Sequence, residues 1–373
     1  MDNRHFICTT DALSPGQSKS FTVKVEGQPD LEVALFNIHG KFYAISEKCQ
    51  HKQGPLSKGT IDESNIVTCP WHGWKYSVVD GKSAHEGGDS VDSYETSVVD
   101  DRVFVNPLPA AKGNRVSKPH ARYAALEKAV DSHLNRAAET AYRRVRVLGI
   151  STTNLNDRVA SRPSTSEAAL EYALKYAGDQ LAGDTVMIKL RQLDFKDCEG
   201  YYSKNAKACI FPCSISEMDE EDQMIEIYER MILWADVVIV ASPIRWGSAS
   251  SLYYKMVQRL NCVQNQAPTH NRFLIRDKVA AFIITGGQDN VQHVAGEMMS
   301  FWTQLGFILG KFPFVGWSRG WYAEDTQNNK DAMNKEQRFE GDVRKMVLGA
   351  IRMSGLLRDA RYDEKLLDRM EFH

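Results

Sequence analysis

The sequence predicts a chain of two domains, an all-β domain followed by an α/β domain with a doubly wound parallel sheet. The first reason is a change of pattern after Asn106, from short strands separated by glycine turns to strands that alternate with helices. The second reason is the length of 373 residues, which exceeds what one ordinary hydrophobic core supports. We predict domains at 1–106 and 144–322, a helical linker at 107–143 and a helical extension at 323–373.

The first domain contains five segments with the β-branched and aromatic content of strands. They are Phe21–Val25, Glu32–Ile38, Lys41–Ala44, Ile66–Thr68 and Val103–Val105. No helical period appears among them, so we expect this domain to be all-β. Two prolines, Pro107 and Pro109, then mark the exit from the domain, and the Ala-, Arg- and Glu-rich stretch 120–141 predicts the helix of the linker.

Strands and helices alternate through the second domain. The predicted strands are Val145–Gly149, Thr185–Leu190, Ala235–Ala241, Lys278–Ile284 and a last one opening at Phe314–Gly316. The predicted helices are Ser166–Leu181, Asp222–Trp234, Tyr253–Leu260 and Val294–Leu305. This order indicates βαβ units, and in such sheets ligands bind beyond the carboxyl ends of the strands.

The composition narrows the classes of partner and compartment. A net charge of −2 gives no general attraction to nucleic acid or to an anionic membrane. No apolar run is long enough for a transmembrane helix, and the first residues do not read as a secretory signal. Seven cysteines, an odd and sparse number, argue against a disulfide framework. We therefore expect a cytoplasmic protein with no nucleic-acid or membrane partner.

Two mixed cysteine–histidine pairs form the strongest motif. Cys49-Gln-His51 is followed after 17 residues by Cys69-Pro-Trp-His72. Two thiolates and two imidazoles are the ligand set of a Rieske-type [2Fe–2S] cluster, in which the two cysteines bind one iron and the two histidines bind the other. A structural zinc ion is the alternative, but zinc ligands usually pair Cys with Cys and His with His. The mixed pairs favour the cluster, with Cys49, His51, Cys69 and His72 as metal ligands.

The sequence Cys-Pro-Trp-His-Gly-Trp in an all-β context resembles the Rieske family over about residues 1–106. Gly54 and Trp71 stand where high-potential members of the family have an extra disulfide, and Trp74 replaces a hydroxyl donor. The resemblance therefore implies a low reduction potential, nearer roughly −150 mV than +300 mV. Lys48, Lys52 and Lys58 flank the first loop and either dock an acidic partner or form a solvated rim.

Three loops at successive strand ends carry a second set of candidates. The first offers hydroxyls and free amides at a helix N-terminus, a common phosphate site; its candidates are Ser151, Thr153, Ser164, Thr165 and Ser166. The second places an aromatic residue between a proline and a glycine, suited to a flat ring; its candidates are Ser242, Pro243, Ile244, Arg245, Trp246 and Gly247. The third lets the backbone approach a ligand through paired glycines; its candidates are Thr285, Gly286, Gly287 and Gln288.

These loops, together with a Leu-Gly-Phe307 helix end, resemble the flavodoxin-like NAD(P)H-dependent FMN reductase superfamily over about residues 145–320. The resemblance implies FMN, NAD(P)H as the electron donor and a homo-oligomer, either a dimer or a tetramer. An insertion around Asn154–Arg162 leaves open which residues of the first loop touch phosphate; Arg162 is a phosphate partner or a surface residue. Cys198, Cys209 and Cys213 lack the tight spacing of a [4Fe–4S] motif, and we expect them to be thiols.

The two cofactors together predict a redox protein that passes electrons from NAD(P)H through FMN to the cluster and on to an external acceptor such as an oxygenase. No acid–base catalytic residue is required for that role. One alternative is reduction of a small acceptor at the flavin, such as a quinone, nitroaromatic, azo or metal species, with the cluster as electron inlet. Another is a non-enzymatic redox sensor or electron carrier. The histidines outside the cluster motif form no close helical ligand pair, which excludes an oxygenase iron in this chain.

Overall fold

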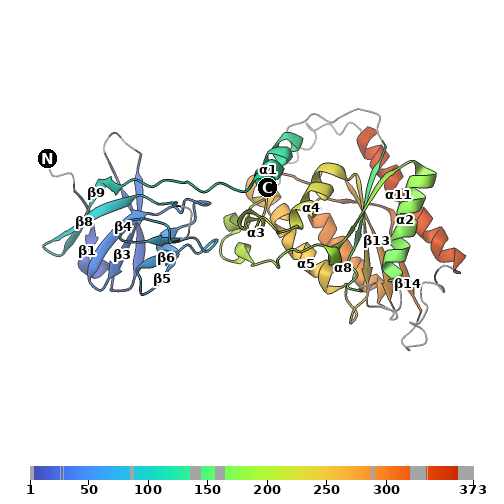
Figure 1. Cartoon of the computed structure of the whole chain (residues 1–373), viewed down its shortest axis with the longest axis horizontal. Coiled ribbons are helices and arrows are strands. Elements are labelled where there is room, and N and C mark those ends of the chain that lie inside the picture. Colours follow the sequence, from blue (N-terminus) through green and yellow to red (C-terminus); the bar gives the residue numbers. More distant parts are fainter. Residues whose placement is uncertain are drawn as a thin grey trace. The chain divides into compact units, whose positions relative to one another are not determined.

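The structure is a computed structural model, and it describes residues 4–25, 27, 29–84, 88–134, 144–155, 164–286, 290–319, 333 and 335–359. The chain divides into two compact units, whose elements are labelled in Figure 1. The first unit comprises Met1–Pro119 and Gly200–Cys209, and the second comprises His120–Glu199 and Ile210–His373. The first unit therefore includes a short segment from much later in the sequence.

The first unit contains two antiparallel sheets. The larger has the order β1-β9-β8-β4-β3-β2, with β1 His5–Thr9, β2 Ser18–Val23, β3 Leu31–Ile38, β4 Lys41–Ser46, β8 Ser93–Val99 and β9 Arg102–Ala111. The smaller has the order β5-β6-β7, with β5 Thr60–Ile61, β6 Ile66–Thr68 and β7 Lys75–Ser77. Among the described residues of this unit, 3₁₀ turns are found at η1 Thr10–Ala12, η2 Leu56–Lys58, η4 Tyr201–Ser203 and η5 Ala206–Ala208.

Strand β3 is buried on both faces, because each face packs in a different hydrophobic core. Val33 and Leu35 face a core shared with strands of the larger sheet. Ala34 and Phe36, on the opposite face of the strand, face a second core that includes residues of the smaller sheet. The second core also contains Cys49 and Cys69, so the predicted ligand loops are anchored in packed apolar side chains.

The all-β prediction for the first domain is confirmed. Each of the five predicted segments overlaps an observed strand. Strands β1, β5, β7 and β8 were not predicted, and β9 continues to Ala111, beyond the predicted boundary at Asn106. Pro107 and Pro109 lie inside β9 and do not end it, because a strand tolerates proline where its missing N–H is not needed for pairing.

The second unit is built on a five-stranded parallel sheet in the order β11-β10-β12-β13-β14. Its strands are β10 Arg146–Ser151, β11 Asp184–Lys189, β12 Val237–Pro243, β13 Val279–Gly286 and β14 Ile308–Ser318. Its helices are α1 Ala121–Leu134, α2 Thr165–Leu181, α3 Ser214–Met218, α4 Met224–Tyr228, α5 Ser251–Arg259, α6 Asn261–Gln264, α7 Gln266–His270, α8 Val291–Gln304 and α11 Gln337–Asp359, with the 3₁₀ turn η3 Leu190–Gln192 and the π-helix η6 Glu229–Trp234. The strand order is that of flavodoxin, so the prediction of a flavodoxin-like doubly wound sheet is confirmed.

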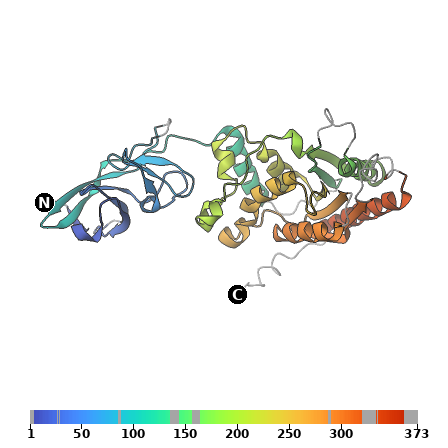
Figure 2. The same ribbon diagram turned by 90° about the horizontal axis from the view of Figure 1, so that it is seen from below.

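Helices cover both faces of this sheet (Figures 1 and 2). Helices α2 and α11 pack against each other and against one face, where Ile239 and Ile283 belong to the same core. On the other face Trp302 of α8 contacts Phe282 edge-on, with ring centroids 6.0 Å apart. Residues 135–143 of the predicted linker and residues 323–332, 334 and 360–373 of the predicted extension lie outside the described residues.

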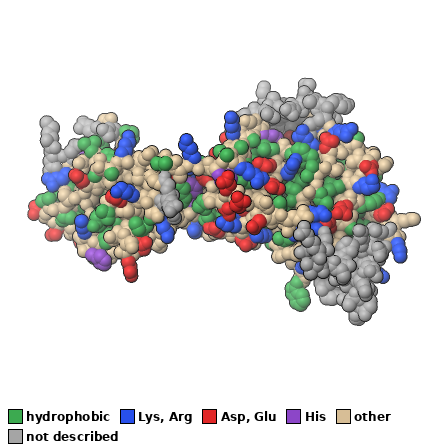
Figure 3. Space-filling view, in the orientation of Figure 1, with side chains coloured by type: hydrophobic (Ala, Val, Ile, Leu, Met, Phe, Trp, Pro, Cys, Tyr) green, Lys and Arg blue, Asp and Glu red, His purple; other side chains and the backbone are tan. Residues whose placement is uncertain are grey.

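Within the described ranges, no helix combines the length and apolar character needed to cross a bilayer. Acidic and basic side chains are interspersed on the face of the second unit seen in Figure 3.

Candidate functional site

The first ligand loop begins at Cys49, which follows the end of β4 at Ser46 after Glu47 and Lys48. The N–H of Cys49 donates to the Gly54 carbonyl at 2.9 Å, and the N–H of Gln53 donates to the Cys49 carbonyl at 3.0 Å. Gln53 has φ +63°, a conformation in the left-handed region that closes the turn. Cys49 and His51 are thereby held on one tight backbone loop.

The second ligand loop, between β6 and β7, repeats this construction. The N–H of Cys69 donates to the Trp74 carbonyl at 2.6 Å, and the N–H of Gly73 donates to the Cys69 carbonyl at 3.1 Å. Gly73 has φ +76° at the position that corresponds to Gln53. Two loops of the same design therefore present one cysteine and one histidine each.

The structure brings the four predicted ligands together. The His51 and His72 rings lie 4.7 Å apart, and His51 stacks on Trp74 at 4.8 Å with an interplanar angle of 2°. Cys49 and Cys69 are also neighbours: a hydrogen bond between the thiols raises the pKa of Cys49 and lowers that of Cys69 to about 7. All four side chains are buried. The donor set has the two thiols in contact and the two imidazoles in contact, as a [2Fe–2S] cluster with separate iron ligands requires.

Gly54 leaves the room that such a group needs beside the loops. A Cβ atom there would lie 2.8 Å from Sγ of Cys69 and 3.0 Å from the Trp71 ring. Real Cβ atoms do not approach other atoms so closely, so any larger residue would displace the thiol or the indole. The residues present therefore fit the cluster.

Two contacts around this site were not predicted from the sequence. Oη of Tyr76 lies 3.6 Å from Sγ of Cys49, and Nη1 of Arg115 donates to the His51 carbonyl at 3.2 Å. Trp74 occupies the position where a hydroxyl donor was expected to be missing, and Tyr76 of β7 places a different hydroxyl beside Cys49. Lys48, expected as a docking residue or part of a solvated rim, forms an exposed ion pair with Glu32 at 2.7 Å.

A third unpredicted contact comes from the late segment of the first unit. Nε2 of His72 lies 2.8 Å from the Ala208 carbonyl oxygen, and the Tyr201 ring packs edge-on against the imidazole at 4.8 Å. Neither residue has a recognisable motif, and both lie more than a hundred positions along the chain from His72.

The predicted phosphate loop is stabilised by a buried carboxylate. Ser164 caps α2, with its oxygen accepting from the Glu167 N–H, and its hydroxyl lies 3.1 Å from that of Ser166. The Ser151 hydroxyl donates to the Glu167 carboxylate at 2.8 Å. Thr153 is buried and accepts from the Leu155 N–H. The described ends of the loop are therefore held by hydrogen bonds, with the proton of Ser151 committed to Glu167, whereas residues 156–163, including Arg162, lie outside the described residues.

Glu167 was not singled out in the sequence. Its carboxylate bonds Lys189 at 2.7 Å and also Arg191. Burial opposes its charge, but the hydrogen bonds from Arg191, Lys189 and Ser151 outweigh that effect and hold its pKa at about 2. Glu167 thus remains ionised and links β10 and α2 to the end of β11.

The predicted ring loop follows β12 and turns sharply at Trp246. Arg245 and Ser248 exchange backbone hydrogen bonds at 2.7 and 3.1 Å, and between them Trp246 and Gly247 have φ +51° and +78°. A bulky residue with positive φ is strained, and this indole is also 97% exposed. Ser242, Pro243 and Ile244 are buried at the base of the loop.

Hydrogen bonds join the three predicted flavin loops. Ser250, at the end of the ring loop, donates to the Thr152 carbonyl of the phosphate loop. Asn290 donates to the Gly247 carbonyl at 2.5 Å, which links the third loop to the ring loop. Among the remaining candidates, the Thr285 carbonyl accepts from the Ile244 N–H at 2.8 Å, and Gly286 lies against Ile244. Thr165 is partly exposed. Gly287 and Gln288 lie outside the described residues. The three loops thus meet at the carboxyl edge of the sheet, as expected.

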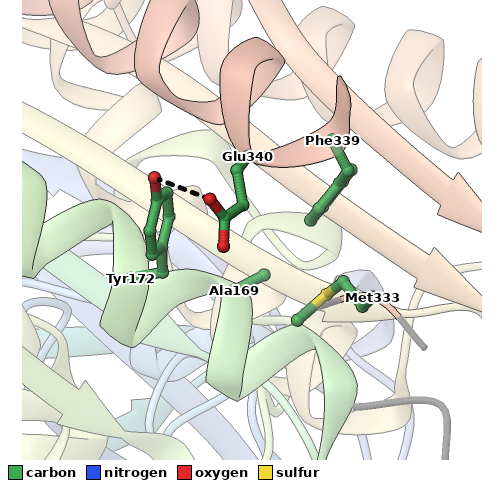
Figure 4. A pocket seen from close by; sticks show the side chains of 5 residues that line it. All are labelled: Ala169, Tyr172, Met333, Phe339 and Glu340. Carbon is green, nitrogen blue, oxygen red and sulfur yellow. Dashed lines mark hydrogen bonds between the residues drawn. The ribbon is translucent and has the colours of Figure 1, made fainter. Parts of the chain in front are cut away.

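Two other features lie away from these loops. A small hollow between α2 and α11, shown in Figure 4, is lined by Ala169, Tyr172, Met333, Phe339 and Glu340, and contains none of the predicted site residues.

The predicted thiols Cys209 and Cys213 fall in different units. Cys209 belongs to the first unit, whereas Cys213 belongs to the second, where a hydrogen bond from Cys262 lowers the pKa of Cys213 to about 6.

Comparison with known proteins finds a matching family model for each of the two parts of the chain. Residues 3–95 match the model of the Rieske [2Fe–2S] domain, and residues 146–321 match that of NADPH-dependent FMN reductase. A 3-phenylpropionate/cinnamic acid dioxygenase ferredoxin subunit from Photorhabdus laumondii is 30% identical over 101 residues, which cover 27% of this chain and 90% of the relative.

Two solved structures are similar to parts of the chain. The ferredoxin of carbazole 1,9a-dioxygenase from Nocardioides aromaticivorans is 27% identical and covers 29% of this chain and all of its own, with a TM-score of 0.26. RosB with bound 8-demethyl-8-formylriboflavin-5'-phosphate is 18% identical and covers 60% of this chain and 85% of its own, with a TM-score of 0.47.

The folds and the family matches define an NAD(P)H-dependent oxidoreductase with a Rieske [2Fe–2S] cluster and FMN as cofactors. The chain belongs to the Rieske [2Fe–2S] domain family through its N-terminal part, and it carries an NADPH-dependent FMN reductase domain at residues 146–321. The Rieske match also decides between the cluster and the zinc alternative in favour of the cluster.

Proposed function

We propose that this electron-transfer reductase passes electrons from NAD(P)H through FMN to the [2Fe–2S] cluster, and from the cluster to an external oxygenase. The proposal assigns Cys49 and Cys69 to one iron and His51 and His72 to the other. The observation that carries it is the convergence of these four buried side chains in a chain that also has an FMN reductase domain.

The residues of the second unit would bind FMN at the three connected loops. The phosphate loop offers hydroxyls at the N-terminus of α2, where free N–H groups favour an anion. The Glu167 carboxylate accepts hydrogen bonds from Lys189, Arg191 and Ser151. Its negative charge is therefore compensated beside that anion site. Trp246 and the backbone of Thr285 and Gly286 would border the flavin ring.

The cofactors supply the redox chemistry, since FMN takes two electrons as hydride and releases them singly, whereas the cluster takes one at a time. The chain binds the two cofactors and buries the four cluster ligands. It also links the two electron carriers covalently, which raises their effective concentration. The similarity to a dioxygenase ferredoxin subunit supports an oxygenase as the acceptor.

The first experiment follows the visible spectrum of the purified protein during anaerobic addition of NADH and then NADPH. We expect the flavin absorbance to bleach and the cluster to be reduced after it. If neither changes although dithionite reduces both, the donor is not a nicotinamide and the proposed sequence of carriers is wrong.

A variant without the cluster tests the second half of the path. His51→Ala should retain NAD(P)H-dependent flavin reduction but lose rapid reduction of cytochrome c, a one-electron protein acceptor. His39→Asn is the matched control, because His39 is exposed in a turn with φ +51°, which asparagine tolerates. Undiminished cytochrome c reduction by His51→Ala would contradict the proposal and favour direct reduction of acceptors at the flavin.

A further inference from the structure

We propose that the segment Gly200–Cys209 is a positioning element of the cluster, in which the Ala208 carbonyl and the Tyr201 ring hold the His72 imidazole and lower the reduction potential. This goes beyond the proposed function, because it depends on neither the electron donor nor the acceptor. The segment is grouped with the Rieske residues in one compact unit although it lies between β11 and β12 in the sequence.

The contacts of His72 select one tautomer. Nε2 lies 2.8 Å from the Ala208 carbonyl oxygen, which can only accept, so Nε2 carries the proton. Nδ1 of the neutral ring then has a lone pair, which is the form that binds a metal. The Tyr201 ring, edge-on at 84°, restricts rotation of the imidazole, which is only 7% exposed.

The segment is built to present that carbonyl. Gly200 opens it with φ +64°, and two successive 3₁₀ turns follow. The Asn205 side chain accepts from the Lys207 N–H at 2.9 Å, and its carbonyl accepts from the Ala208 N–H at 2.9 Å. Tyr201 and Ala208 are buried while residues 202–207 between them are exposed. The hydrogen bonds of Asn205 therefore fix the turn that carries the Ala208 carbonyl.

The electrostatic effect follows from the direction of the hydrogen bond. An imidazole that donates to a carbonyl becomes a more electron-rich ligand. An electron-rich ligand stabilises the oxidised cluster more than the reduced one, so the potential falls. The contact of Tyr76 with Cys49 acts in the opposite sense, because a hydroxyl donor stabilises the added negative charge.

Asn205→Ala tests the proposal on the holoprotein, with Asn205→Ser as the matched control that retains a capping oxygen. We expect Asn205→Ala to shift the reduction potential of the cluster to a more positive value. The equilibrium constant for reduction of the cluster should rise about fivefold, which corresponds to one net hydrogen bond. The g-values of the reduced cluster in EPR should also change, since the geometry of one ligand is released. Asn205→Ser should match the wild type in both measurements. Unchanged potential and g-values in Asn205→Ala would overturn the proposal.

Acylation by diethyl pyrocarbonate gives a second readout, which begins with the wild-type protein. In the wild-type holoprotein we expect His72 to be protected at Nε2 and exposed His39 to react, with the sites mapped by mass spectrometry. Tyr201→Ala should make His72 reactive, whereas Tyr201→Phe, which keeps the ring, should leave it protected. Acylation of His72 in the wild type as fast as that of His39 would overturn the proposal, even if Asn205→Ala failed to assemble a cluster.

Discussion

Oη of Tyr76 lies 3.6 Å from Sγ of Cys49, and both atoms are buried in the core that anchors the two ligand loops. A hydroxyl that donates to a cluster thiolate stabilises the reduced state. We therefore predict that Tyr76→Phe makes the reduction potential more negative by on the order of 40 mV, which corresponds to roughly 1 kcal/mol for one hydrogen bond. A redox titration monitored by EPR measures the change.

Tyr94→Phe is the control for that prediction. Tyr94 is a buried tyrosine of the same unit, but its hydroxyl donates to Asp92. Its replacement should leave the potential unchanged. Equal shifts in both variants would mean that Tyr76 acts through general destabilisation and not through Cys49.

Gly54 provides a steric test of the cluster site. Gly54→Ala places a Cβ 2.8 Å from Sγ of Cys69, so we predict a marked fall in iron per chain and in the EPR signal of the reduced protein. Gly73→Ala is the comparison, because its Cβ meets nothing within 4 Å and costs only the strain of a positive φ, about 1 kcal/mol. If Gly54→Ala binds as much iron as Gly73→Ala, the ligand loops do not close on a cluster at this position.

Glu167→Gln tests the carboxylate behind the phosphate loop. Its pKa is lowered from an ordinary value near 4.5 to about 2, so its ionised form stabilises the folded state above pH 4.5. That contribution, on the order of 3 kcal/mol, is lost as pH falls from about 4.5 to about 2. We predict that Glu167→Gln lowers the free energy of unfolding at pH 7 and flattens its decline over this pH range.

Urea unfolding at a series of pH values measures this effect, and Glu171→Gln is the control. Glu171 lies on the same helix and contacts the same Lys189 at 3.5 Å, but its side chain is about half exposed. Surface pairs of this kind contribute at most about 1 kcal/mol. A similar pH dependence of both variants would contradict the role assigned to Glu167.

Trp246 combines a strained backbone with an almost fully exposed indole, and neither stabilises the fold by itself. We predict that Trp246→Gly leaves the thermal stability of the FMN-free protein unchanged or raises it. FMN binding should weaken about fivefold, since a ring contact contributes roughly 1 kcal/mol. Fluorescence titration with FMN measures the affinity.

Phe312→Gly is the matched control in the same unit. Phe312 also has a positive φ, +55°, and is exposed, but it lies within β14 and outside the three flavin loops. Its replacement relieves the same kind of strain and should not change FMN affinity. Unchanged FMN affinity in Trp246→Gly would remove Trp246 from the proposed ring site.

Local patterns explain which parts were predictable. The strand and helix order could be read from apolar periodicity, because β12 and β13 are buried along nearly their whole length. Pro107 and Pro109 are predicted to mark the exit from the domain, but pairing with β8 keeps β9 extended through both prolines. The long predicted helix Asp222–Trp234 is observed as α4 followed by the π-helix η6.

The four ligands and the two fold classes could be predicted from the sequence, because ligand identity, short spacing and apolar period are properties of neighbouring residues. The tertiary structure alone decided what surrounds the ligands. Tyr76 is separated from Cys49 by 27 positions and Ala208 from His72 by 136. A carbonyl has no sequence signature, since every residue has one, and only the folded chain selects which carbonyl meets an imidazole.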